Sequence, residues 1–202
     1  MTPDVALQSA YKILDLNVLK QASVLAYMDV FLYLGLMFLI CIPFVLFVGR
    51  ITRQKGISQL IAAAQHFNAN CQIVLCAGAP DTPEIAAETE QLIAELKATR
   101  EGVILISEML PREKVKVLYS HARVFACPSL YEPFGIINHE AMSCETPLVG
   151  SAVGGIPEII VEGQTGFLVP LAPVSRTDFN PANPHAFQQD FATQANLFLD
   201  NE

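Results

Sequence analysis

The chain has 202 residues, of which 52% are apolar and only 16% charged, and its formal net charge is −8. The high content of Val, Ile, Leu and Phe excludes low-complexity disorder, and five irregularly spaced cysteines exclude a disulfide scaffold. The acidic balance, with no basic stripe, argues against nucleic acid as a partner.

The apolar excess is concentrated in residues 30–48, a run of nineteen residues without a charge. A helix needs roughly 20 apolar residues to cross a bilayer, and a core strand is much shorter. We therefore predict a single long hydrophobic helix over residues 24–42, as a transmembrane segment in preference to a buried core element. Cations are more frequent after the run than before it, so the remainder is expected in the cytoplasm, anchored at the inner membrane.

A first strand is predicted at Phe44–Val48, which is short, apolar and followed by Gly49. The sequence thus divides into an N-terminal segment, residues 1–42, and a domain, residues 43–202.

Beyond Arg50, apolar strands alternate with amphipathic helices. Helices are predicted at Ile57–Phe67, Pro83–Arg100, Arg112–Ser120, Gly135–Cys144 and His185–Leu199. Further strands are predicted at Gln72–Cys76, Val103–Ile106, Val124–Cys127, Pro147–Gly150 and Phe167–Val169, followed by a proline-rich loop or linker at Pro170–Pro184. Repeated strand–helix–strand units indicate an α/β fold, a Rossmann-like doubly wound parallel sheet, whose ligands bind at the carboxyl ends of the strands.

The segment Gly49–Gly56 follows the first strand and contains the cations Arg50 and Lys55, with Arg53 between them. Cations at the carboxyl edge of a sheet, beside a helix N-terminus, are suited to a diphosphate. Taken alone, the segment is read more simply as a solvated loop with incidental charges.

A second motif has two glutamates, Glu132 and Glu140, separated by seven residues that include Phe134-Gly135-Ile136. Carboxylates are natural acceptors for the paired hydroxyls of a ribose or a hexose, and the amides that follow Gly135 can bind an anion or a hydroxyl. Singly, Glu132 is also consistent with a helix cap and Glu140 with a surface position.

A third motif, Ser151–Glu158, carries paired glycines after a strand. It is not the G-x-G-x-x-G fingerprint of a dinucleotide-binding dehydrogenase.

The segments GRITRQKG, CAGAPDTPEI, EMLPREKV, CPSLYEPFGIINHEAM and GGIPEIIVEGQTGFLVP occur in this order. Together they resemble the C-terminal, donor-binding domain of family-four GT-B glycosyltransferases, and the nearest likeness is to glycogen synthases of actinobacterial type. The resemblance covers about Phe44 to Glu202.

This resemblance implies roles for individual residues. Arg50, Lys55 and Glu132 are implied to be catalytic: the two cations bind the donor diphosphate and Glu132 contacts the donor sugar. Glu140 is implied to bind the ribose. The remaining donor-binding positions that it implies are Met109 and Leu110 beside the base, and Phe134, Gly135, Ile136 and Ile137 in the loop against sugar and phosphate.

The activity implied is retaining glucosyl transfer from a nucleotide-diphospho-sugar, ADP-glucose or UDP-glucose, to a glucan acceptor such as glycogen. No D-x-D motif occurs, so neither a metal nor another cofactor is expected, and the cations replace the metal.

Two departures from the family pattern affect the expectation. The residues before the first strand are too few for the acceptor-binding domain, and the family's final helix, which crosses back to that domain, is expected to be missing. Residues 1–42 instead resemble the last helix of a major facilitator drug transporter through Gln21–Tyr27 and the apolar run. The chain is therefore expected to be a truncated enzyme, inactive in isolation. The alternatives are a membrane-anchored, non-catalytic nucleotide-sugar-binding module and an inactive fusion product.

Overall fold

The computed structural model describes residues 18–22, 28 and 43–200, and the chain divides into two compact units, Met1–Cys41 and Ile42–Glu202. In the first unit, residues 18–22 and 28 are helical. Apart from Met28, the hydrophobic helix predicted over residues 24–42 lies outside the described residues. Within the described ranges, no helix is both long and apolar enough to cross a membrane.

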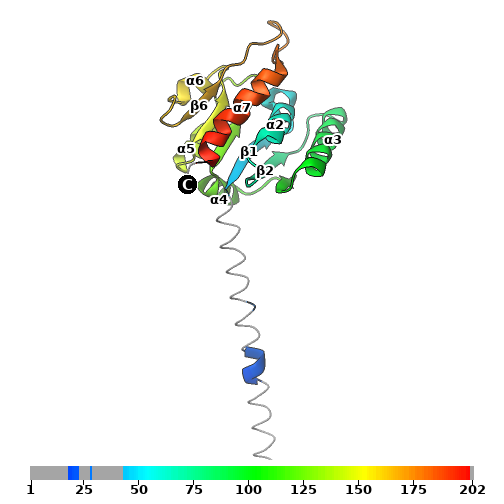
Figure 1. Cartoon of the computed structure of the whole chain (residues 1–202), viewed down its shortest axis with the longest axis vertical. Helices are drawn as coiled ribbons and strands as arrows, with labels where there is room; N and C mark the ends of the chain where they lie inside the picture. Colours follow the sequence, from blue (N-terminus) through cyan, green and yellow to red (C-terminus); the bar gives the residue numbers. More distant parts are fainter. Residues whose placement is uncertain (1–17, 23–27, 29–42, 201–202) are drawn as a thin grey trace, which may run out of the picture. The chain divides into compact units, whose positions relative to one another are not determined.

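The second unit is built on a six-stranded sheet with the order β3-β2-β1-β4-β5-β6, and every strand pair is parallel (Figure 1). The strands are β1 (Phe44–Arg50), β2 (Gln72–Gly78), β3 (Val103–Ile106), β4 (Val124–Cys127), β5 (Leu148–Ser151) and β6 (Gly166–Val169). The predicted Rossmann-like parallel sheet is confirmed. The first strand, β1, lies in the middle of the sheet. The next strands are added outward on one side, as β2 and β3, and the later ones on the other side, as β4 to β6, so the topological switch point lies between β1 and β4.

The predicted helices are also present. They are α2 (Ile57–Ala63), α3 (Pro83–Thr99), α4 (Arg112–His121), α5 (Ile136–Ser143) and α7 (Pro184–Leu199), and a 3₁₀ turn, η2 (Ala64–His66), completes the segment predicted as one helix after Gly56. Thr82 caps α3, because its Oγ1 accepts a hydrogen bond from the Ile85 amide at 3.3 Å. Two elements were not predicted, the 3₁₀ turn η1 (Arg53–Lys55) and the short helix α6 (Ile156–Ile159), because three or four residues show no helical period.

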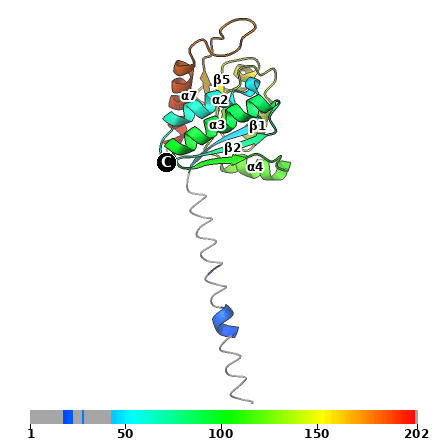
Figure 2. The ribbon, with the colours of Figure 1, turned by 90° about the vertical axis from the view of Figure 1, so that its right-hand side faces the viewer.

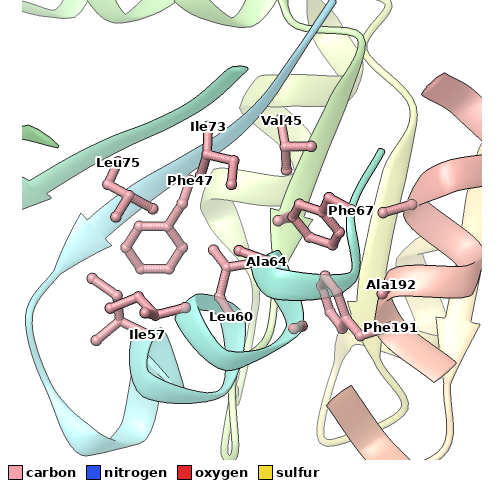
Figure 3. Close-up of a cluster of buried hydrophobic side chains, with 14 of the residues drawn as sticks. Val45, Phe47, Ile57, Leu60, Ala64, Phe67, Ile73, Leu75, Phe191 and Ala192 are labelled. Carbon is pink, nitrogen blue, oxygen red and sulfur yellow. The ribbon is translucent and has the colours of Figure 1, made fainter. Parts of the chain in front are cut away.

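Alternation along β1 divides the core between the two faces of the sheet. Val45 and Phe47 pack with α2, α3 and α7, whereas Leu46 packs on the opposite face with residues of α4, α5 and α6. Figure 3 shows the first cluster, in which Phe191 of α7 lies beside Phe67, and Figure 2 shows α2 and α3 lying over this face. Burial of each such side chain contributes about 1.5–3 kcal/mol, and the rigid sheet that results positions the loops at its carboxyl edge.

Candidate active site

Two loops meet at the switch point, the loop that follows β1 and the loop that follows β4. The amide of Leu130 donates to the Gln54 carbonyl at 2.8 Å, and Gln54 Nε2 donates to the Tyr131 carbonyl at 2.9 Å. Gly56 has a φ of +63°, and a Cβ at this position would lie 2.0 Å from the Pro128 carbonyl oxygen. Only glycine therefore allows the two loops to approach this closely.

This contact brings Lys55 and Glu132 together. Lys55 Nζ lies 2.5 Å from Glu132 Oε2, and the two side chains are only 23% and 8% exposed. Lys55 is held by η1, where the Thr52 hydroxyl oxygen accepts its amide at 3.2 Å. Lys55 and Glu132 lie 77 positions apart in the sequence and thus form one partly buried ion pair in the structure.

Both oxygens of the Glu132 carboxylate accept hydrogen bonds, which fix its orientation. Ser129 Oγ donates to Oε2 at 3.3 Å, and the Gly135 amide donates to Oε1 at 3.2 Å. The Glu132 backbone is fixed by the loop after β5, because its carbonyl accepts the Gly155 amide at 2.9 Å. Gly154, at a φ of +54°, would place a Cβ only 2.1 Å from the same carbonyl oxygen. Three loops at the carboxyl edge therefore determine where this carboxylate lies.

Helix α5 begins at the same place. Gly135 precedes it with a φ of +72°, and the partial positive charge of the helix N-terminus faces the carboxyl edge. The side chains of Phe134 and Ile136 are exposed, whereas Ile137 packs against the core and could reach a ligand only through its backbone.

Glu140 lies in a separate cavity between α4 and α5, with a volume of about 360 Å³. Its Oε1 is 3.8 Å from Arg112 Nη2, and Ile136 also lines the cavity. The wall contains the buried hydroxyl of Tyr119, which has no hydrogen-bond partner among the described residues. Burial, and then the charge of Glu140, raise the pKa of Tyr119. No hydrogen bond or ion pair within the described part of the chain joins Glu140 to the Lys55–Glu132 pair.

The other predicted donor residues are exposed at the same edge. Arg50 Nη1 pairs with Asp81 Oδ1 at 3.0 Å, and neither partner is buried. Such a surface pair contributes about 0–1 kcal/mol, so a phosphate could displace Asp81 at little cost. Met109 is 85% exposed and Leu110 is half-buried, both in the loop after β3.

Sequence reasoning missed three side chains of the site. Ser129, Gln54 and Arg112 were given no role, although each belongs to a segment that follows a strand of the sheet. That placement was the available signal, but it could not distinguish them from neighbouring loop residues. For metals, the described residues contain no cluster of three or more side chains that could hold an ion.

Solved structures share this fold. Sucrose-phosphate synthase from Thermosynechococcus elongatus superposes with a TM-score of 0.57 at 32% identity, over 80% of this chain and 41% of that one. HepE from Anabaena in complex with UDP-glucose gives a TM-score of 0.66 at 23% identity, over 83% of this chain and 42% of that one. The second unit thus has the fold of one half of a GT-B glycosyltransferase.

The family model of the glycosyl transferases group 1 matches residues 42–175, and the chain belongs to this family. The α-maltose-1-phosphate synthase of Mycolicibacterium smegmatis is 56% identical over 127 residues, which cover 63% of this chain and 33% of that protein. A D-inositol 3-phosphate glycosyltransferase from Corynebacterium glutamicum is 32% identical over 154 residues, 74% of this chain and 34% of that protein.

The chain spans about a third of the length of these curated relatives. Neither relative is named a glycogen synthase, which is the type of enzyme that the sequence resemblance implied. The family match begins at residue 42, so it gives no support to the transporter resemblance of residues 1–42.

Proposed function

We propose that this domain binds a nucleotide-diphospho-sugar and forms the donor half-site of a retaining glucosyltransferase. The observation that carries the proposal is the partly buried Lys55–Glu132 pair at the switch point of the sheet. A lysine and a carboxylate that are partly shielded from water at the carboxyl edge, beside the start of a helix, suit a ligand that is both anionic and rich in hydroxyls.

The reaction breaks the bond between the anomeric carbon and a diphosphate oxygen, and the electron pair of that bond leaves with the diphosphate. Lys55, Arg50 and the first amides of α5 supply fixed positive charge where this negative charge develops. Glu132 accepts hydrogen bonds from donor hydroxyls once Lys55 turns to the phosphate. The acceptor hydroxyl oxygen forms the new bond to the anomeric carbon, and its proton passes to an oxygen of the departing diphosphate.

The nucleoside is assigned to the cavity between α4 and α5, where Glu140 accepts the ribose hydroxyls. Met109 and Leu110, at the start of the loop that leads into α4, cover the base with apolar surface. We propose ADP-glucose or UDP-glucose as the donor. HepE, a protein of the same fold, was solved with UDP-glucose, which supports UDP-glucose as one of the two ligands to try; ADP-glucose rests on the sequence resemblance alone.

We propose a small phosphorylated sugar as the acceptor. The named relatives make or use α-maltose 1-phosphate and D-inositol 3-phosphate, both small phosphate esters. α-Maltose 1-phosphate is a glucosyl unit on glucose 1-phosphate, so glucose 1-phosphate is the acceptor we favour. A glucan such as glycogen, implied by the sequence resemblance, is the competing outcome.

Calorimetric titration of the 202-residue chain with ADP-glucose and UDP-glucose tests the donor site. We expect one of them to bind, and Lys55→Met and Glu140→Ala each to weaken binding by about ten- to a hundred-fold, since each loses a charge-assisted hydrogen bond. Glu95→Ala is the matched control, because this carboxylate lies on α3, where Gln91 of the same helix is its partner. Absence of binding by both sugar nucleotides overturns the proposal.

A further inference from the structure

A second cavity lies directly beside the Lys55–Glu132 pair. Its volume is about 280 Å³, and its walls are Arg53, Gln54, Leu130, Tyr131, Phe179 and Asn180. Gln54 precedes Lys55 in the chain and Tyr131 precedes Glu132, and the hydrogen bond from Gln54 Nε2 to the Tyr131 carbonyl joins the two segments. The cavity is therefore formed by the same two loops that hold the ion pair.

An exposed pair of aromatic side chains lines this cavity. The ring centroids of Tyr131 and Phe179 lie 5.2 Å apart with an interplanar angle of 36°. The two residues remain 46% and 43% exposed, although both are large and mostly apolar. Polar side chains surround them, since Arg53, Gln54 and Asn180 supply donors and acceptors at the rim.

Phe179 is held in place by an ordered turn. The Val174 amide donates to the Asn180 carbonyl at 2.9 Å, and the Ala182 amide donates to the Ala172 carbonyl at 2.8 Å. Inside the turn, Asp178 Oδ1 accepts both the amide and the side-chain Nδ2 of Asn180, at 3.0 and 2.8 Å. The segment that was predicted to be a loop or linker thus holds an aromatic ring beside that of Tyr131.

An apolar floor with a polar rim matches the surface of a sugar ring. A hexopyranose presents C–H faces that pack on aromatic rings, and its hydroxyls point outward toward hydrogen-bonding groups. The volume is just under the range of about 300–1,000 Å³ typical of sites for drug-sized molecules, so it suits one sugar ring and not a whole nucleotide sugar.

We propose that the Tyr131–Phe179 cavity is a saccharide subsite that binds one hexopyranose ring of the acceptor. The proposal rests on the proposed function, because the ring is placed next to the residues that bind the donor. Tyr131 and Phe179 act by packing on the ring, and Gln54 and Asn180 bind its hydroxyls.

Saturation-transfer NMR on the full chain tests the subsite, with glucose 1-phosphate and maltotriose as separate probes. We expect saturation transfer to at least one probe. Tyr131→Ala and Phe179→Ala should each weaken its binding roughly five-fold, the size of one aromatic contact, whereas Tyr131→Phe keeps the ring and the affinity. Val174→Ala is the matched control, because Val174 is an exposed apolar residue of the same turn outside the cavity. Thermal unfolding checks that each variant is folded.

Parallel titration with UDP-glucose and ADP-glucose separates this proposal from the donor site. If a sugar nucleotide binds but neither probe does, or if a probe binds equally to all variants, the subsite is wrong and the donor site stands. If a probe binds and is lost in the two alanine variants while no sugar nucleotide binds, the subsite stands and the donor assignment falls. Binding of an apolar peptide in place of either saccharide would assign the cavity to protein contact and overturn the proposal.

Discussion

Glu132 shows how much local structure one carboxylate requires. Its two oxygens take hydrogen bonds from Ser129 and from the Gly135 amide, and Lys55 balances its charge. A buried ion pair is costly unless its remaining hydrogen-bonding capacity is satisfied, and here both oxygens are satisfied. Such a group is held at a defined place before any ligand arrives, which is what binding a sugar at a fixed angle requires.

Ser129→Ala tests this pre-orientation. The variant loses one hydrogen bond to the carboxylate, and the alanine fits because the serine is fully buried and larger by only one oxygen. We expect sugar-nucleotide affinity to fall about five- to ten-fold, while the free energy of unfolding falls by about 1 kcal/mol. Calorimetry and urea unfolding measure the two effects, and unchanged affinity would show that Ser129 does not position Glu132.

Four buried acids give the domain a defined response to alkaline pH. Burial raises the pKa of the thiols of Cys71, Cys76 and Cys127, and also that of the Tyr119 phenol. The unfolded chain therefore loses these protons at a lower pH than the folded chain does. The free energy of unfolding should be at its full value below about pH 8.5, the ordinary thiol pKa, and decrease as the pH rises further.

Urea unfolding between pH 7.5 and 10.5 measures this decrease. Tyr119→Phe should remove the part of the decrease that sets in near pH 10, and because the hydroxyl has no described partner, it should cost little or no stability at pH 7.5. Stability that increases with pH in this range would contradict the assignment.

At the scale of elements, the end of α3 is joined to the loop between η2 and β2 by a single side chain. Arg100 directly follows α3, and its guanidinium donates to four backbone carbonyls. The acceptors are Ala64 at 2.6 Å, Phe67 at 3.3 Å, Asn68 at 3.0 Å and Cys71 at 2.9 Å. The Ala64 and Asn68 carbonyls also accept the backbone amides of Phe67 and Cys71, at 3.3 and 3.2 Å. The arginine is therefore a second donor to these two carbonyls, and it supplies the side-chain donor to the carbonyls of Phe67 and Cys71.

Arg100→Gln should therefore be destabilising, by about 2–4 kcal/mol, because the carbonyls of Phe67 and Cys71 lose their charged donor and two further carbonyls lose one of two donors. Lys97→Gln, an exposed change on the same helix, should stay within about 0.5 kcal/mol. Chemical denaturation of the two variants beside the parent chain measures the difference, and equal midpoints would show that the arginine contacts are dispensable.

The elements themselves were largely readable from the sequence. Apolar runs and turn residues located all six strands and the longer helices, because each has enough residues to show a period. Reading Ile57–Phe67 as one helix missed its change to 3₁₀ geometry at Ala64. The role of Arg100 could not be seen, since its four acceptors lie 29 to 36 residues away and are backbone atoms.

At the scale of the whole molecule, the strand order explains why distant motifs form one site. β1 and β4 are neighbours, so the loops that carry Lys55 and Glu132 leave the sheet side by side at the point where the connections diverge. The sequence predicted both residues and the edge on which they lie. It could not predict that they pair with each other in the absence of a donor, or that Glu140 faces Arg112 in a cavity of its own, because both contacts depend on side-chain packing.

The matched region corresponds to about a third of each curated relative, and the cavity at Tyr131 and Phe179 adjoins the proposed donor site. We expect the purified 202-residue chain to bind its sugar nucleotide yet to transfer glucose to glucose 1-phosphate or glycogen at a negligible rate, because transfer also requires the acceptor hydroxyl to be held within bonding reach of the anomeric carbon. Binding should be unchanged by EDTA, since Lys55 and Arg50 provide the positive charge for the diphosphate.

Radiolabelled transfer assays and calorimetry with and without EDTA measure both expectations, with the Lys55→Met variant as the control for specific binding. Robust transfer by the chain alone would show that this unit also positions the acceptor hydroxyl. Loss of binding in EDTA, restored by magnesium, would show that the two cations are insufficient and that the donor diphosphate arrives with a metal ion.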